Sequence, residues 1–122
     1  MRVIKRQQGV RPLKEYKMTY KSKDLCFYDE CDILDLLKAA HKHGATDVEV
    51  RNSDWGEESF KVTDKDGIIE LLDGADMDWA FRFEKNGEYL GTFYIVLGND
   101  DGSAVYDSSC QKWCDTIWDE IA

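Results

Sequence analysis

The chain has 122 residues, of which 43% are hydrophobic and 12% aromatic, with a single proline. This composition excludes a globally disordered chain, and the longest purely apolar run, residues 93–97, is far too short for a membrane helix. We therefore expect one globular domain that spans residues 1–122.

Charge is distributed unevenly along the chain, whose formal net charge is −9. Residues 1–23 hold eight Lys or Arg against Glu15 alone, which gives +7. Residues 24–122 hold eight basic and 24 acidic residues, which gives −16. Such asymmetry bears on partners and solubility rather than on the fold.

The N-terminal segment holds the basic stretch RPLKEYKMTYKSK (11–23). Within it, Tyr16, Met18 and Tyr20 alternate with polar residues, the pattern of a half-buried strand. Lysines discourage pairing between exposed strand edges, so we expect an edge strand whose charge offsets the acidic body. Residues 1–13 begin with MRVIKR and are compatible with a loosely attached strand or an arm. They lack the apolar core of a secretory signal, so we expect a cytoplasmic protein with reduced cysteines.

The first helix is expected over residues 30–43. Asp29 is its expected N-cap, acidic residues fill its first turn, and Gly44 is its expected stop. Its apolar positions share one face: Ile33, Leu36, Leu37 and Ala40.

Two short strands and a short helix should follow. Alternation predicts strands over 46–51 and around 60–62. Thr63 and Asp66 have capping-box spacing ahead of a short helix over about 64–73.

The clearest local signal is a β-hairpin, with strands over 77–84 and 88–97 joined by Asn86–Gly87. This dipeptide favours a two-residue type I′ turn, so facing residue numbers should sum to 173. That register predicts three facing pairs on the core side of the sheet: Trp79 with Tyr94, Phe81 with Thr92, and Phe83 with Leu90. It places Arg82 opposite Gly91 on the other side, which Ala80 and Phe93 share.

The chain should end with a turn at GNDDGS (98–103), a short strand around 104–106, and a helix over 109–121. Ser108 and Gln111 have capping-box spacing for this helix. Its expected apolar stripe consists of Cys110, Trp113, Cys114, Ile117 and Ile121.

The predicted fold is α+β. Hairpins dominate the element order, so we expect a mostly antiparallel sheet of about five to six strands. Two longer helices and one short helix should pack on one face of it.

Candidate catalytic and metal-ligating residues are few. The cysteines (Cys26, Cys31, Cys110 and Cys114) have spacings that suit a zinc site poorly. Cys110 and Cys114 are interpreted as small apolar residues of a helix stripe. His41 and His43 are two residues apart and cannot share a helix face. We expect no enzyme and no cofactor; the alternative is a small metal-binding or thiol-dependent domain that uses these residues.

The acidic residues provide the main functional hypothesis. Three of them crowd the C-terminal half of the last helix, against its dipole, with no local benefit evident from the sequence. Other carboxylates flank glycine turns. The candidate partner-binding surface is Asp115, Asp119, Glu120, Asp100, Asp101, Asp76 and Asp78.

This surface suggests a small non-enzymatic protein that docks on a basic protein surface. A sharper version is a nucleic-acid mimic that acts as an inhibitor or an immunity-like regulator, with carboxylates in place of phosphates. Acidity that serves only solubility is the competing explanation. We expect neither membrane binding nor direct nucleic-acid binding.

Overall fold

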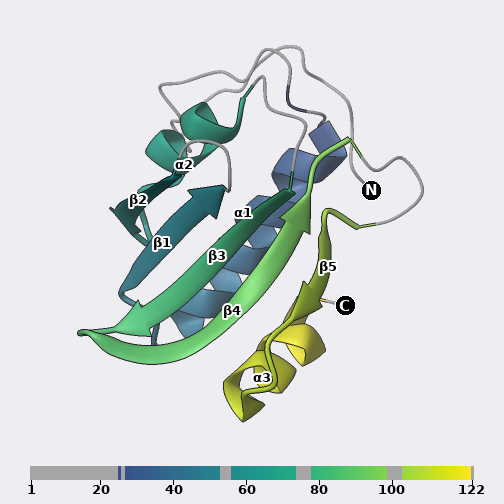
Figure 1. Ribbon diagram of the computed structural model, residues 1–122. Helices are drawn as coiled ribbons and strands as arrows, with labels where there is room; N and C mark the ends of the chain where they lie inside the picture. Colours follow the sequence, from purple (N-terminus) through teal and green to yellow (C-terminus); the bar gives the residue numbers. More distant parts are fainter. Residues whose placement is uncertain (1–24, 26, 53–55, 74–77, 99–102, 122) are drawn as a thin grey trace.

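The computed structural model describes residues 25, 27–52, 56–73, 78–98 and 103–121 (Figure 1). In this part of the chain, five antiparallel strands form one sheet with the order β2-β1-β3-β4-β5, accompanied by three helices. The predicted α+β class is confirmed. The two strands expected before residue 24, including the lysine-rich edge strand, lie outside the described residues.

The elements follow the predicted order, with small shifts at their ends. They are α1 (Phe27–Lys42), β1 (Asp47–Asn52), β2 (Gly56–Lys61), α2 (Lys65–Leu72), β3 (Asp78–Lys85), β4 (Glu88–Val96), β5 (Val105–Ser108) and α3 (Lys112–Ile121).

Helix α1 begins two residues before Asp29, so the prediction that Asp29 is the N-cap was wrong. The Asp29 side chain is buried, and its Oδ2 accepts a hydrogen bond from the backbone N–H of Gly98 at 2.9 Å. Asp32 Oδ2 accepts one from the N–H of Ala104 at 3.0 Å. These two carboxylates therefore attach the N-terminus of α1 to both ends of the connection between β4 and β5.

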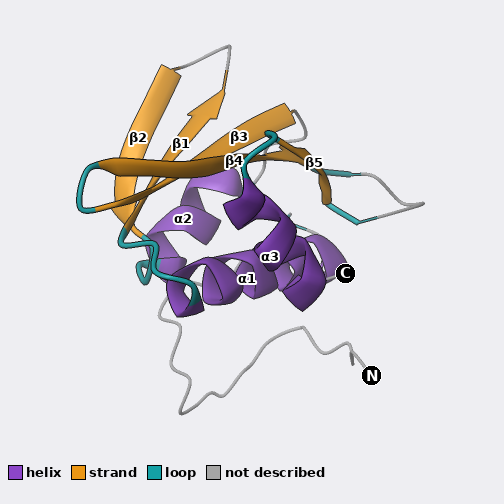
Figure 2. Cartoon of the chain, turned by 90° about the horizontal axis from the view of Figure 1, so that it is seen from below, coloured by secondary structure: helices purple, strands orange, loops and turns teal. Residues whose placement is uncertain are grey.

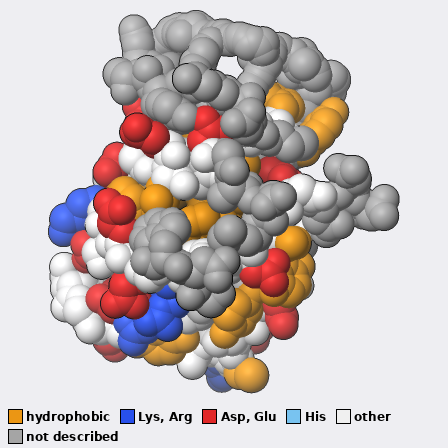
Figure 3. Space-filling view, turned by 45° about the horizontal axis from the view of Figure 1, so that its top comes forward, with side chains coloured by type: hydrophobic (Ala, Val, Ile, Leu, Met, Phe, Trp, Pro, Cys, Tyr) orange, Lys and Arg blue, Asp and Glu red, His pale blue; other side chains and the backbone are white. Residues whose placement is uncertain are grey.

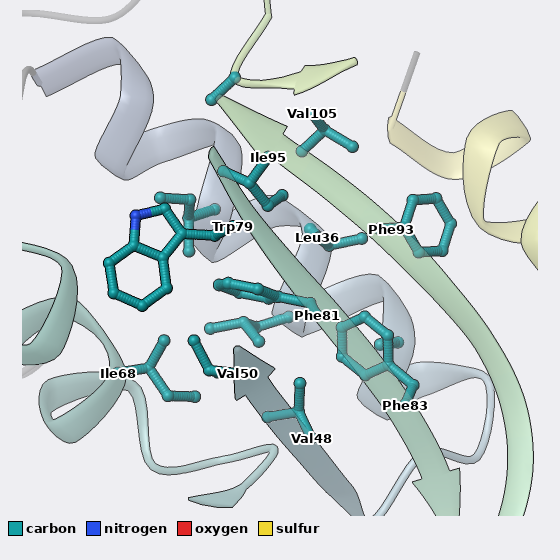
Figure 4. Close-up of a cluster of buried hydrophobic side chains, with 14 of the residues drawn as sticks. Leu36, Val48, Val50, Ile68, Trp79, Phe81, Phe83, Phe93, Ile95 and Val105 are labelled. Atoms are coloured by element: carbon teal, nitrogen blue, oxygen red, sulfur yellow. The ribbon is translucent and has the colours of Figure 1, made fainter. Parts of the chain in front are cut away.

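The three described helices lie on one face of the sheet, as predicted, and no described helix covers the other face, which we call the open face (Figure 2). The core fills the space between the two layers. Side chains of β1 and β3 alternate between the core and the open face, so Val50, Phe81 and Phe83 point toward the helices (Figure 4). Leu36 of α1 and Ile68 of α2 meet them from the helix layer.

The register of the hairpin corrects the predicted pairing. Asn86 (φ 50°) and Gly87 (φ 90°) have the positive φ angles of a type I′ turn, and Lys85 faces Glu88 as expected. A β-bulge follows, because Glu84 faces Tyr89 but Phe83 faces Gly91, which leaves Leu90 as the extra residue.

Because of the extra residue, the β4 side chains beyond the bulge point to the opposite face of the sheet from the one predicted. Trp79 faces Ile95 and Phe81 faces Phe93, so the predicted pairs on the core side were wrong. Phe93 is fully buried in the core, whereas Tyr94 is half-buried opposite Ala80 on the open face. A shift of one residue has this effect because strand side chains alternate with a period of two.

Helix α2 is capped by Asp64, not by the predicted pair Thr63 and Asp66. The Asp64 side chain accepts a hydrogen bond from the backbone N–H of Gly67 at 3.1 Å. A Cβ atom on Gly67 would lie 2.7 Å from Asp64 Oδ2, so a residue without a side chain lets the carboxylate approach this N–H.

Helix α3 packs under β4 through Cys114 and Ile117, which are fully buried, and through the two half-buried tryptophans. The Trp113 ring lies 5.6 Å from the Phe83 ring, and the Trp118 ring 5.5 Å from the Phe93 ring. Cys110 is exposed before the helix begins, so its predicted place on the apolar stripe was wrong.

Candidate functional site

The four described carboxylates of the predicted acidic surface lie in two places, at the start of β3 and on α3. Asp76, Asp100 and Asp101 lie outside the described residues. Asp78 is exposed at the start of β3, on the open face of the sheet. The remaining three carboxylates, Asp115, Asp119 and Glu120, are exposed on α3 in the helix layer.

Glu120 has a structural role that the sequence did not reveal. Its carboxylate accepts a hydrogen bond from Lys42 Nζ at 2.8 Å and lies 3.2 Å from His43 Nε2, at the end of α1. The bonds from Lys42 and His43 lower the pKa of Glu120. The interpretation that its position against the helix dipole brings no local benefit was therefore wrong, because Glu120 connects α3 to α1.

Helix α3 begins at Lys112, so Asp115 lies in its first turn and the prediction that it opposes the helix dipole was wrong, whereas Asp119 lies near the C-terminal end as predicted. Both are exposed at i and i+4 on α3, and neither forms an ion pair with any described residue. The described residues include eight Lys or Arg and nineteen Asp or Glu, which gives a formal charge of −11. Figure 3 shows carboxylates spread over the visible surface of this part, with fewer basic side chains among them.

On the open face of the sheet, basic side chains form ion pairs with acidic neighbours. Lys61 Nζ lies 3.0 Å from Asp47 Oδ1, across β1 and β2. Hydrogen bonds from Thr46 and Lys61 lower the pKa of Asp47. At the hairpin end, Arg82 forms an ion pair with Glu84.

One row of side chains crosses all five strands on this face. The strand registers place Glu57, Arg51, Ala80, Tyr94 and Asp107 successively opposite one another. Arg51 Nη2 donates to Glu57 Oε1 at 2.9 Å and lies 3.4 Å from Glu49 Oε1. The hydrogen bond to Glu57 and, to a smaller extent, the charge of Glu49 raise the pKa of Arg51. This guanidinium is therefore already paired with carboxylates of its own chain.

A hollow of about 480 Å³ opens at the centre of this row. Ala80 is the one small side chain between Arg51 and Tyr94, which face it from the neighbouring strands. The hollow's lining includes Arg51, Glu57, Asp78, Ala80, Tyr94 and Tyr106. The hollow was not predictable from the sequence, because the expected register placed Tyr94 in the core.

The two tyrosines of the hollow are available for contact. Tyr106 is 51% exposed, and Tyr94 is half-buried. The side chain of neither tyrosine makes a hydrogen bond or a ring contact with any described residue. The Asp78 carboxylate likewise has no cationic partner within the described part, so the hollow combines two aromatic rings with an uncompensated negative charge.

A second groove, of about 630 Å³, lies on the helix side between α1 and the start of α2. Cys31 and His41 both line it. They are ten residues apart on α1, which separates them by about 15 Å along the helix axis, too far to bind one metal ion together. Among the residues that the structure describes, no group of three His, Cys, Asp or Glu side chains lies close enough to hold a metal ion.

The remaining described thiols, Cys110 and Cys114, differ in burial. Cys114 is fully buried, and burial raises the pKa of its thiol. A thiol with a raised pKa is a poor nucleophile near neutral pH. Its interpretation as a packing residue is confirmed by its burial against β4. Cys110 is an exposed free thiol.

The chain matched no protein-family model, no curated protein and no solved structure when compared with each. None of the described helices has the length and apolar character that crossing a bilayer requires.

Proposed function

We propose that this chain is a non-enzymatic protein that docks on a basic protein surface through its exposed carboxylates. The observation that carries the proposal is the imbalance of ion pairing on the described surface. Lys42, Arg51, Lys61 and Arg82 are paired with acidic side chains of the same chain. Three other described cations, Lys38, Lys85 and Lys112, have no acidic partner in the described part, and the unpaired exposed acids outnumber them. Exposed acids without any cationic partner in the described part are Glu58, Asp64, Glu70, Asp78, Glu88, Asp107, Asp115 and Asp119.

Asp115 and Asp119 support the proposal most directly. A like-charge pair at i and i+4 on a helix costs a few tenths of a kcal/mol, and no described cation offsets it here. Asp119 also lies near the negative C-terminal end of the helix dipole, whereas Asp115 lies in the first turn. Unpaired charges around a docking site increase the rate of association with an oppositely charged partner and suppress binding of other acidic surfaces.

Capture of a partner from a lysate of the native host tests the proposal. The immobilised full chain should retain a basic protein at low salt and release it at high salt, because exposed charges are screened. Asp115→Asn with Asp119→Asn should reduce capture at least threefold. Glu58→Gln with Glu70→Gln is the matched control: it removes the same charge at the β2 and α2 end of the molecule and should reduce capture less than the α3 variant does.

Equal capture by both double variants would remove α3 from the binding surface. Absence of any salt-sensitive partner would leave solubility as the explanation of the acidity and refute the proposal. Release of the captured protein by added duplex DNA would favour the nucleic-acid mimic, because carboxylates and phosphates would then compete for the same cleft.

A further inference from the structure

We infer that the hollow on the open face of the sheet receives an arginine side chain of a basic protein partner. The inference rests on the proposed function and names the contact by which the partner is recognised. It is carried by the chemistry of the hollow together with an arginine site that the same sheet face already contains.

That existing site lies at the hairpin end of the face. The guanidinium carbon of Arg82 lies 4.4 Å from the centre of the Tyr89 ring, and Arg82 also forms an ion pair with Glu84. A tyrosine ring and a carboxylate thus hold one arginine of this chain by stacking and by charge.

The hollow offers the same two groups without the cation. Tyr94 and Tyr106 line it, and Asp78 contributes a carboxylate that lacks a cationic partner in the described part. Asp107 faces Tyr94 from β5 and adds a second carboxylate without a cationic partner in the described part, although its Oδ1 accepts a hydrogen bond from the backbone N–H of Ser108. The arginine within the lining, Arg51, is already bonded to Glu57 and is close to Glu49.

Arginine suits this hollow better than lysine. Its planar guanidinium stacks on tyrosine rings while donating to carboxylates at its edge, whereas an ammonium is more strongly hydrated and cannot stack in this way. A volume of about 480 Å³ is large enough for the whole side chain with water around it. Net negative charge around the hollow favours any cation, and the tyrosines select the guanidinium.

The test uses ¹⁵N-labelled full-length protein and two synthetic probes, a hexa-arginine and a hexa-lysine peptide. Hexa-arginine should shift the amide signals of Ala80, Tyr94 and Tyr106. It should bind about fivefold more tightly than hexa-lysine, which corresponds to roughly 1 kcal/mol of stacking.

Two pairs of variants separate stacking from charge. Tyr94→Thr with Tyr106→Ala should reduce the arginine preference to near onefold while weak salt-sensitive binding of both peptides persists. Asp78→Asn with Asp107→Asn should weaken hexa-arginine binding more than Asp115→Asn with Asp119→Asn, which removes equal charge elsewhere. The melting temperature of each variant identifies any that fails to fold, in which case Tyr106→Ala alone, at the more exposed ring, carries the test.

Other outcomes would overturn the inference. Peptide shifts confined to α3, or equal affinity for the two peptides, would exclude an arginine site in the hollow and leave the proposed function standing. Hollow signals that move when Arg2, Arg6 and Arg11 are replaced by Gln, without any peptide, would show that the chain fills the hollow itself. If the wild-type chain neither bound the peptides nor captured a partner, both proposals would be refuted.

Discussion

The contact between Gly91 and Cys114 gives a quantitative test of the packing of α3 under the bulged strand. A Cβ atom added at Gly91 would lie 2.4 Å from Cys114 Sγ and 3.3 Å from Trp113 Cε3. Gly91 is buried on β4 and Cys114 is fully buried on α3, so neither element can move away without disturbing the core. Gly91→Ala should therefore destabilise the fold.

The magnitude follows from the size of the overlap. The contact with sulfur is shorter than an ordinary contact by about 1 Å, and overpacking of this kind costs about 1–3 kcal/mol. We expect Gly91→Ala to lower the free energy of unfolding by about 2 kcal/mol. Cys114→Ala removes a buried group about the size of a methylene and should cost about 1 kcal/mol.

The double variant isolates the contact. Once the sulfur is absent, Gly91→Ala should cost less than about 1 kcal/mol, so the coupling energy should be about 1–2 kcal/mol. Urea unfolding followed by tryptophan fluorescence measures each value. As a matched control, Gly91→Ala in a Cys31→Ala background should retain its full cost, because Cys31 lies on α1 and is not among the atoms near Gly91.

The reasoning would be refuted if Gly91→Ala cost the same with and without Cys114. The cost would then come from Trp113 or from the backbone of the bulge, and the close approach of α3 to β4 would have no energetic effect.

Two further predictions concern the ends of helices. Asp64→Ala should lower the free energy of unfolding by about 1 kcal/mol through loss of the α2 cap, whereas Thr63→Ala should change it by less than about 0.5 kcal/mol. Urea denaturation measures both values. A larger loss for Thr63→Ala than for Asp64→Ala would identify Thr63 as the cap. Glu120→Gln should lower the melting temperature at pH 6, with Asp119→Asn as an unpaired control that does not. Because the pKa of Glu120 is lowered in the folded protein, its stabilisation is present above its unfolded value of 4.5 and is lost as pH falls through the folded pKa. The difference between wild type and Glu120→Gln should therefore shrink as pH falls below 4.5 and through the folded pKa, and a difference that does not change with falling pH would exclude the ion pair as its source.

The secondary structure was predictable because its signals are local. The Asn86–Gly87 turn, the period of α1 and the alternation of β3 are all contained in short stretches of sequence. Gly87 adopts φ 90°, and Asn86 is the residue type that most readily tolerates a positive φ beside it. Each of these elements appears in the structure within a few residues of its predicted position.

The face assignment of β4 was not predictable by the same means. Apolar residues occur at both odd and even positions of this strand, so alternation alone does not say which set is buried. The bulge at Leu90 decides the question, and it buries Phe93 and Ile95 while Tyr94 reaches the open face. Packing against α3, which is distant in the sequence, favours this choice because Gly91 is the residue that accommodates Cys114.

The candidate site depended even more on tertiary structure. Sequence identified the excess of acids and the exposed pair Asp115 and Asp119, because charge and helical spacing are local properties. The partner of Glu120 lies 78 residues away at Lys42, and the hollow requires the registers of five strands. Composition determined that the protein is acidic, whereas the tertiary structure decided which carboxylates are paired, because ion pairing depends on distances that only folding sets.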